Sequence, residues 1–171
     1  MSEKSGDLID VTTGWVNLTT KCNNRCAWCY RSEDFLAPPE VMSLSLAHQV
    51  VDFFGKLGIY SCIFIGGEPT LYPGLPKLIR QAKICGIPEI TVVSNGRKYK
   101  HRDYVRMLAA EGLDHFSISI HSSDRESHNS ICGTSSWDDT IQGIQNVVAE
   151  GYRCTLNLIA GRRNYDSVLE S

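Results

Sequence analysis

The chain has 171 residues, of which 42% are hydrophobic and 21% charged, and its formal net charge is −2. This length fits one domain with a sizeable core, and the composition is that of an ordinary globular chain. The charge provides no basic field for a nucleic acid or a membrane surface. The sequence contains no run of about 18 apolar residues, which excludes a transmembrane helix. The polar start lacks a secretory signal. We therefore expect a cytoplasmic protein.

Strand and helix patterns alternate along the chain. Strands are expected over 13–19, 62–65, 90–93, 115–120 and 155–159, and helices between Ser43 and Gly58, over about 76–85 and 102–111, and between Ser136 and Gly151. The polar stretch 31–40 should be a surface connection. We expect residues 1–12 to form an N-terminal extension and residues 13–171 to form the domain, which ends in a fifth helix capped by Asn164.

Two patterns predict which side chains are buried. Five apolar residues recur at helical spacing in the first helix and should form its buried face: Leu46, Val50, Phe53, Phe54 and Leu57. In the strand 115–120, Phe116, Ile118 and Ile120 should face one side and the intervening serines the other.

The alternation of strands and helices predicts an α/β fold with a parallel sheet. Five strands cannot close an eight-stranded barrel. The side chains expected on the inner face are polar, namely Asn17, Ser117, Ser119, Thr155 and Asn157. Because a closed barrel core needs branched apolar residues there, we predict a partial TIM-type barrel with a site inside it.

Seven cysteines are present, an odd number in a chain with its own core, which argues against a disulfide framework. Cys62, Cys85 and Cys154 are interpreted as small buried hydrophobes. Cys132 is expected in a loop.

The remaining cysteines, Cys22, Cys26 and Cys29, fall within one polar loop after the first strand. Three thiolates at this spacing can bind three irons of a [4Fe-4S] cluster, which leaves the fourth iron open to a small chelating molecule. A zinc site with a distant fourth ligand and three incidental thiols are the alternatives. Zinc sites usually contain two ligand pairs, and no second pair follows here.

Two further motifs follow strands, Gly66-Gly67-Glu68-Pro69 after the second and Ser94-Asn95-Gly96 after the third. The carboxyl ends of parallel strands meet at one edge of the sheet, so these motifs should lie beside the cysteine loop. Together with C-x3-C-x-aromatic-C, in which Trp28 is the aromatic residue, they resemble the radical S-adenosylmethionine (radical SAM) superfamily. The stretch from Ser119-Ile120-His121-Ser122 to Gly133 resembles its peptide-maturing and SPASM-type members.

The resemblance implies a role for each motif. Cys22, Cys26 and Cys29 would bind a [4Fe-4S] cluster. Gly66 and Gly67, through positive φ and close backbone approach, would hold the methionine amino group of S-adenosylmethionine, and Glu68 would accept a hydrogen bond from it or brace the loop. The other implied cofactor-binding residues are Trp28 by the adenine, Ser94, Asn95 and Ser119 at the ribose and carboxylate, His121 facing cofactor or substrate, and Asn157 on the fifth strand. Tight turns, interior hydrogen bonds and packing are the structural alternatives for these residues.

The resemblance also implies an enzyme. The reduced cluster would cleave S-adenosylmethionine to a 5′-deoxyadenosyl radical that abstracts hydrogen from a substrate, and a peptide or protein side chain is the expected substrate. A flavodoxin or ferredoxin would be the reductant.

Family cores have six strand–helix units, whereas this chain has five strands and stops in the fifth helix. It would then be a fragment, a short enzyme completed by a partner or by self-association, or a degenerate protein. The apolar edge after Ile159 predicts self-association. The alternative function is a truncated, non-catalytic iron–sulfur or zinc-binding module that needs a partner.

Overall fold

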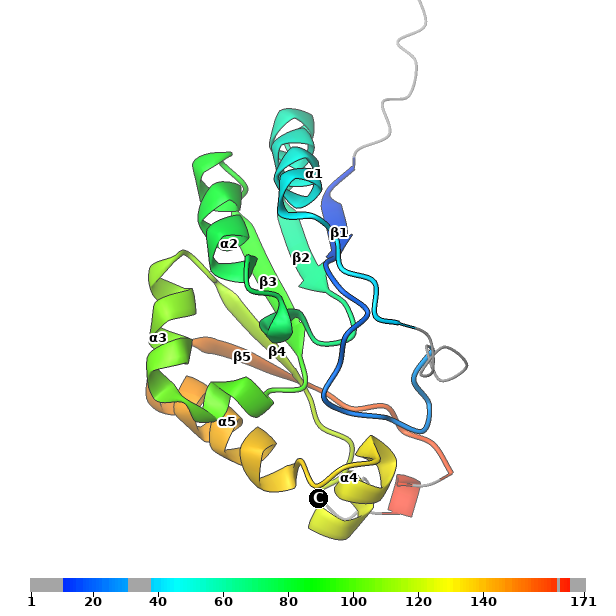
Figure 1. The fold of residues 1–171 in the computed structure, drawn as a ribbon. Helices are drawn as coiled ribbons and strands as arrows, with labels where there is room; N and C mark the ends of the chain where they lie inside the picture. The colour runs from blue at the N-terminus through cyan, green and yellow to red at the C-terminus, as the bar shows by residue number, and fades with distance from the viewer. Residues whose placement is uncertain (1–10, 31–37, 163, 167–171) are drawn as a thin grey trace, which may run out of the picture.

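The computed structural model describes residues 11–30, 38–162 and 164–166. Their strands form one parallel sheet in the order β1 (Thr13–Asn17), β2 (Ser61–Ile65), β3 (Glu89–Ser94), β4 (His115–Ser119) and β5 (Arg153–Asn157). Each strand lies beside the next one in the chain, whereas a doubly wound sheet reverses its strand order at a switch point. This is the topology of a barrel segment, which confirms the predicted α/β partial barrel (Figure 1).

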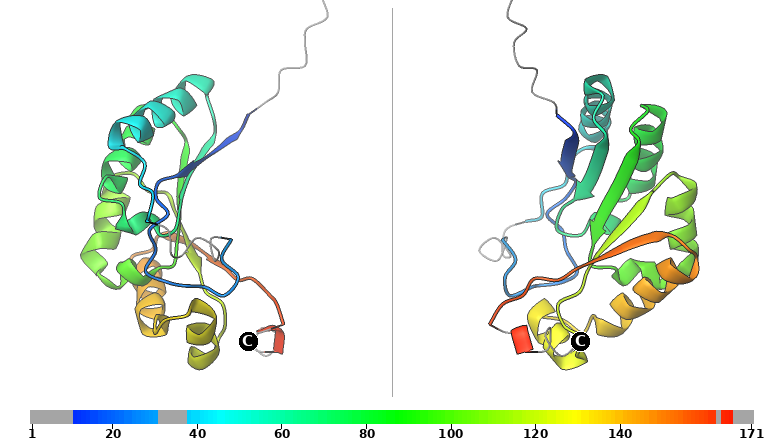
Figure 2. Two further views of the ribbon diagram at one scale, coloured as in Figure 1. Left: turned by 45° about the vertical axis from the view of Figure 1, so that its right-hand side comes forward. Right: turned by 180° about the vertical axis from the view of Figure 1, so that it is seen from behind.

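The helices of the described chain are α1 (Leu44–Leu57), α2 (Leu75–Ile84), α3 (Arg102–Ala110), α4 (Arg125–Cys132) and α5 (Trp137–Ala149), with 3-10 turns η2 (Pro69–Leu71) and η3 (Arg97–Lys100). Helices α1, α2, α3 and α5 cover one face of the curved sheet, while the loop after β1 crosses its other side (Figure 2). Helix α4 lies beyond the carboxyl ends of the strands (Figure 1).

The core lies between the sheet and these helices. Alternate strand residues Phe64, Ile90, Val92, Phe116 and Ile118 are fully buried, and they pack with Leu75, Leu78, Ile79 and Leu108 from α2 and α3. The alternation predicted for β4 is confirmed. On the opposite face His115 lies 2.7 Å from the Thr155 hydroxyl, and the Asn157 side chain donates to Ser117. The inner face is polar on β4 and β5 as predicted, whereas β2 and β3 place the apolar Ile65 and Val93 in the cavity wall.

The boundaries of α1 are as predicted, but its buried face is only partly so. The Ser43 hydroxyl caps its start, and Gly58, with φ of +68°, ends it. Ala47 and Val51 are buried, whereas three of the residues predicted to be buried, Leu46, Phe53 and Leu57, are exposed. The helix covers the edge of the sheet and packs against one neighbouring helix, α2, so only a narrow stripe is enclosed.

Strand β5 begins and ends two residues earlier than predicted. Pairing with β4 aligns Arg153 with His115 and Asn157 with Ser119, which fixes its limits. A shift of two residues preserves which side chains face inward, because strand side chains alternate with period two. The strand forms one edge of the sheet, and Leu156, Leu158 and Ile159 are exposed there. Self-association through this edge stays a prediction.

Helix α4 was not predicted, and the placement of Cys132 in a loop is wrong. The Asp124 carboxylate accepts from the Ser127 N–H at 2.7 Å and caps the first turn, and Gly133, with φ of +62°, ends the helix. The sequence lacks a long apolar stripe here, so helical periodicity gave no indication of it. Cys132, in its last turn, is buried.

Other predictions need only brief comment. Cys62 is buried as predicted, but Cys85 and Cys154 are half-buried, and the Cys85 thiol donates to Asp52. Residues 1–10 of the expected extension 1–12, residues 31–37 of the expected connection 31–40 and any helix beyond 166 lie outside the described residues, and residues 38–40 are exposed as predicted.

Candidate active site

The loop that carries the three motif cysteines is held against the end of β2 by backbone hydrogen bonds. The Gly67 N–H donates to the Thr19 carbonyl at 2.6 Å, and the Glu68 N–H donates to the Lys21 carbonyl at 2.8 Å. A Cβ at Gly66 would lie 2.5 Å from the Thr19 carbonyl, and one at Gly67 would lie 2.5 Å from the Lys21 carbonyl. The two glycines are required for this close approach.

The structure corrects the expected reason for this Gly-Gly pair. Positive φ was expected, yet neither Gly66 nor Gly67 is among the described glycines with positive φ. Because the Gly67 and Glu68 N–H groups are already bonded, and an ammonium group only donates, a methionine amino group would bond carbonyl oxygens here.

Glu68 braces the ends of two neighbouring strands. Its Oε1 accepts from the Thr70 N–H, the Thr70 hydroxyl and the Ser94 hydroxyl, at 3.0, 2.6 and 2.8 Å. Its Oε2 accepts from the Asn95 N–H at 2.7 Å. The carboxyl is 1% exposed. Burial raises its pKa, and the four donors oppose that shift. Of the two roles expected for Glu68, these contacts support the brace.

Arg97 was missed by sequence reasoning and links the end of β3 to the cysteine loop. Its guanidinium donates to the Asn23 carbonyl at 2.6 Å and to the Asn24 side chain at 3.1 Å. Asp139 of α5 pairs with the same guanidinium at 3.3 Å. The Asn95 amide donates to the Asn23 side chain at 2.7 Å, so Asn95 also holds the loop. Arg97 is a single arginine after a turn and belongs to no sequence motif, so the sequence did not indicate that it holds the cysteine loop.

Helix α4 supports the cysteine loop from the other side. The Arg25 N–H donates to the Cys132 carbonyl and the Ala27 N–H donates to the Ile131 carbonyl, both at 2.8 Å. A Cβ on Gly133 would approach the Arg25 carbonyl to 2.6 Å. The loop is therefore fixed between β2, η3 and the end of α4.

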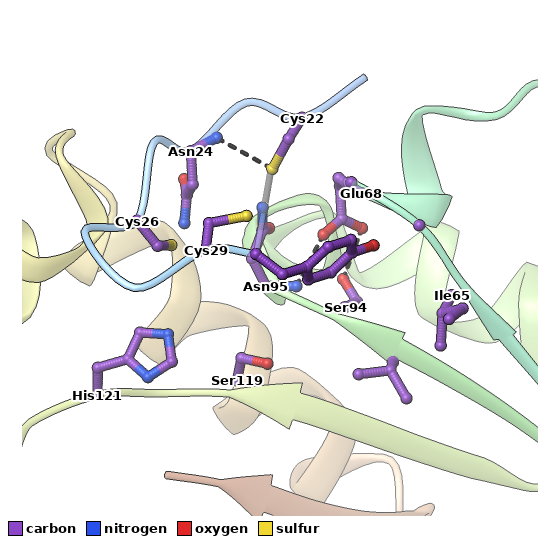
Figure 3. Close-up of a pocket in the computed structure, with 14 residues that line it drawn as sticks. Cys22, Asn24, Cys26, Cys29, Ile65, Glu68, Ser94, Asn95, Ser119 and His121 are labelled. Carbon is purple, nitrogen blue, oxygen red and sulfur yellow. Dashed lines mark hydrogen bonds between the residues drawn. The ribbon is translucent and has the colours of Figure 1, made fainter. Parts of the chain in front are cut away.

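A cavity of about 240 Å³ opens beneath this loop at the carboxyl ends of the strands (Figure 3). The predicted residues that line it are Cys22, Cys26, Cys29, Gly66, Gly67, Glu68, Ser94, Asn95, Ser119 and His121. Tyr30 and Asn24 also line it and were not predicted. Trp28 and Asn157 are not among the lining residues. Trp28 instead packs edge-on against His121 at a ring separation of 5.2 Å.

The thiol environment fits a metal cluster. The Asn24 N–H donates to Cys22 Sγ at 3.3 Å, and such a donor favours a thiolate. Burial nevertheless raises the pKa of Cys22 to about 11. The pKa of the Cys26 thiol is also raised, first by its hydrogen-bond interaction with Cys132 and then by burial. Bound metal favours deprotonation of such thiols. No fourth cysteine lines the cavity in the described part of the chain.

His121 lies at the end of the cavity nearest Cys26 (Figure 3). The residue is 6% exposed, and its Nδ1 has no hydrogen-bond partner among the described residues. The His121 N–H donates to His128 Nδ1 at 3.3 Å, and its carbonyl accepts from the Asn164 amide at 2.6 Å. The Asn164 side chain therefore fixes His121, and its Oδ1 accepts from the preceding Gly161 N–H at 2.8 Å. The helix that Asn164 is expected to cap continues outside the described residues, so that cap stays a prediction.

A barrel segment with three thiols, a Gly-Gly-Glu turn and polar strand ends around one cavity has the arrangement of a cofactor-binding site. The family model for the radical SAM superfamily matches residues 16–171. The chain belongs to the radical SAM superfamily. This family consists of enzymes that use a [4Fe-4S] cluster and S-adenosylmethionine.

Curated relatives of similar sequence bear the name "Probable GTP 3′,8-cyclase". The chain is 29% identical to that of Saccharolobus solfataricus over 160 residues, covering 91% of this chain and 50% of the relative. It is 33% identical to that of Sulfurisphaera tokodaii over 156 residues, covering 87% of this chain and 47% of the relative. The chain thus spans about half the length of these relatives.

Solved structures show the same fold. The Streptococcus suis protein SuiB bound to S-adenosylmethionine matches with a TM-score of 0.76 at 20% identity, over 94% of this chain and 36% of that one. Methylornithine synthase matches with a TM-score of 0.74 at 14% identity, over 93% and 48%. In the described part of the chain, no helix is long and apolar enough to span a membrane.

Proposed function

We propose that Cys22, Cys26 and Cys29 hold a [4Fe-4S] cluster and that the chain forms the cofactor-binding half of a radical SAM enzyme. The observation that carries this proposal is the set of three thiols lining one cavity with Gly66-Gly67-Glu68. When bound, the cluster and S-adenosylmethionine supply a 5′-deoxyadenosyl radical that abstracts hydrogen from a substrate.

The chain's own residues supply placement. Ser119, as the family resemblance implies, and the Gly66 and Gly67 carbonyls would offer polar atoms to S-adenosylmethionine. Ser94 and Asn95 line the same cavity, but their side chains already bond within the protein, Ser94 to Glu68 and Asn95 to Asn23. Their contribution is then chiefly to position the loop and the cavity wall.

Two substrate classes follow from the comparisons. The curated relatives are named for a nucleotide reaction, and one SuiB structure is bound to a precursor peptide. We retain a peptide as the proposed substrate class because of the motif around Ser119 and His121. A purine nucleotide is the second candidate, supported by the sequence relatives. Incubation of the reconstituted protein with each class, and detection of 5′-deoxyadenosine formed only in its presence, distinguishes them.

The test of the site is anaerobic reconstitution with iron and sulfide, followed by reduction with dithionite and EPR with and without S-adenosylmethionine. We expect a [4Fe-4S]⁺ signal that changes when the cofactor is added. The triple variant Cys22→Ala, Cys26→Ala, Cys29→Ala should show none, while the control Cys154→Ser should match the wild type. A cluster that does not respond to the cofactor, or no cluster, would favour the truncated non-catalytic module instead.

A further inference from the structure

A second group of metal-ligating side chains meets at one side of the proposed cluster site. One ligand atom from each of Cys26, His121 and Cys132 lies within 4.8 Å of the other two. Two thiolates and an imidazole are a donor set that zinc and similar thiophilic divalent ions prefer. Zinc sites with three protein ligands keep a fourth position for water or substrate. The group is thus complete enough to bind an ion without Cys22 or Cys29.

The burial of these side chains points to a ligand. Cys132 is 1% exposed and His121 is 6% exposed. The His121 ring carries a buried Nδ1 with no hydrogen-bond partner in the described part of the chain. An unpaired buried polar atom is costly and uncommon, and a ligand bound at the ring removes that cost.

The three ligands come from different segments that are already fixed relative to one another. Cys26 lies between Arg25 and Ala27, whose N–H groups bond the last turn of α4, where Cys132 lies. The His121 carbonyl accepts from the Asn164 amide at 2.6 Å. Such preorganisation lowers the cost of assembling a site.

An outer partner is also in place. His128 Nε2 lies 3.3 Å from Cys132 Sγ and 3.1 Å from the Ser136 hydroxyl. Partners of this kind orient metal-binding side chains and increase their affinity. On the cavity side, Cys26 lies nearer His121 than Cys22 does (Figure 3).

We propose that the cluster-free protein binds one thiophilic divalent cation at Cys26, His121 and Cys132, which we call the mononuclear site. Cys26 belongs to this site and to the proposed cluster ligands, so one occupant excludes the other. This exclusion rests on the proposed function, whereas binding of the cation does not. The ion would hold the loop in place before the cluster is assembled and would have to leave as the cluster forms.

The test uses Zn²⁺ and Co²⁺ as probes on the full chain, freed of metal by a chelator under anaerobic conditions. We expect one zinc per chain by elemental analysis, and cobalt spectra with thiolate charge-transfer and tetrahedral d–d bands. Cys132→Ser should weaken zinc binding by at least about 100-fold, since loss of an outer partner alone costs about 10- to 100-fold. The double variant Cys22→Ser, Cys29→Ser should bind zinc as the wild type does.

Cluster assembly gives the opposite pattern and separates the two proposals. Cys132→Ser should still reconstitute the cluster, whereas the double variant should not, and zinc preloaded on the wild type should slow iron incorporation. Cys154→Ser is the matched control, and circular dichroism verifies folding. If Cys132→Ser does not fold, His121→Gln replaces it. The proposal of a mononuclear site would be overturned if the double variant lost zinc binding while Cys132→Ser or His121→Gln retained it. This outcome does not depend on the result for the cluster.

Discussion

The carboxylate of Glu68 should be a main determinant of the stability of the sheet's carboxyl edge. In Glu68→Gln, the amide oxygen can replace Oε1 and keep its three donors from Thr70 and Ser94. The amide NH2 then faces the Asn95 N–H, which had donated to Oε2 at 2.7 Å. Two donors confront each other, and a hydrogen bond to a charged group is lost.

The magnitude follows from these contacts. A hydrogen bond to a charged group contributes about 1.5–3 kcal/mol, and a buried donor without an acceptor costs about 1–3 kcal/mol. Burial of a neutral amide costs less than burial of a carboxylate, which offsets part of this loss. We therefore expect Glu68→Gln to lower the free energy of unfolding by about 2 kcal/mol. Glu68→Ala, which removes all four acceptor contacts, should cost about 4 kcal/mol or more.

Urea denaturation of the cluster-free protein measures the free energy of unfolding of each variant. The slope m should be the same in the variants and the wild type, so that a changed midpoint reports a changed stability. Glu111→Gln is the matched control, because Glu111 pairs with the exposed Arg80 and such surface pairs contribute little. Equal stability of the Glu68→Gln protein and the wild type would refute the assignment of Glu68 as a brace.

Three further outcomes are expected. Gly67→Ala should destabilise the protein by about 1–3 kcal/mol, since the new Cβ would lie 2.5 Å from the Lys21 carbonyl. Gly161→Ala is the control, because among the described residues outside its chain neighbours the nearest atom to its Cβ belongs to Trp28, at 3.9 Å, and thermal melting compares the two variants. Arg97→Lys should increase protease cleavage of the cysteine loop without changing the melting temperature of the sheet core, because a lysine cannot keep all the contacts of the guanidinium. Burial lowers the pKa of His128, so just below pH 6.5 the native state binds fewer protons than the unfolded state. The free energy of unfolding should therefore fall as the pH is lowered through that range. Urea titrations at successive pH values measure this dependence, and His128→Gln should reduce it.

The repeating pattern of strands and helices was readable from the sequence because it depends on local periodicity. Largely buried strands such as β2 and β3 appear in the sequence as short apolar runs. Helix ends appear as glycines, such as Gly58, which adopts the left-handed conformation in the structure. The meeting of the cysteine, Gly-Gly-Glu and Ser-Asn motifs also followed from topology, since all three come after parallel strands.

Other features depend on contacts that periodicity does not encode. Arg97 has no neighbour in sequence that indicates its contact with Asn23, because the two residues are brought together by the fold. The capping residues Asp124 and Gly133 could have indicated α4, but the helix between them is too polar to show an apolar stripe. Its detection would have placed Cys132 at a helix end rather than in a loop.

The cysteine loop is supported on two sides, and its ligands differ in which support they depend on. Cys22 lies next to Asn23, which Arg97 and Asn95 bind from the end of β3. Cys26 lies between the two N–H groups that bond the end of α4. Cluster assembly needs both supports, whereas the mononuclear site needs the α4 support and the His121 segment, which Asn164 holds, but not the support from β3. Loosening the β3 support should therefore impair the cluster first and leave cation binding intact, which makes Arg97 the residue whose substitution separates the two states.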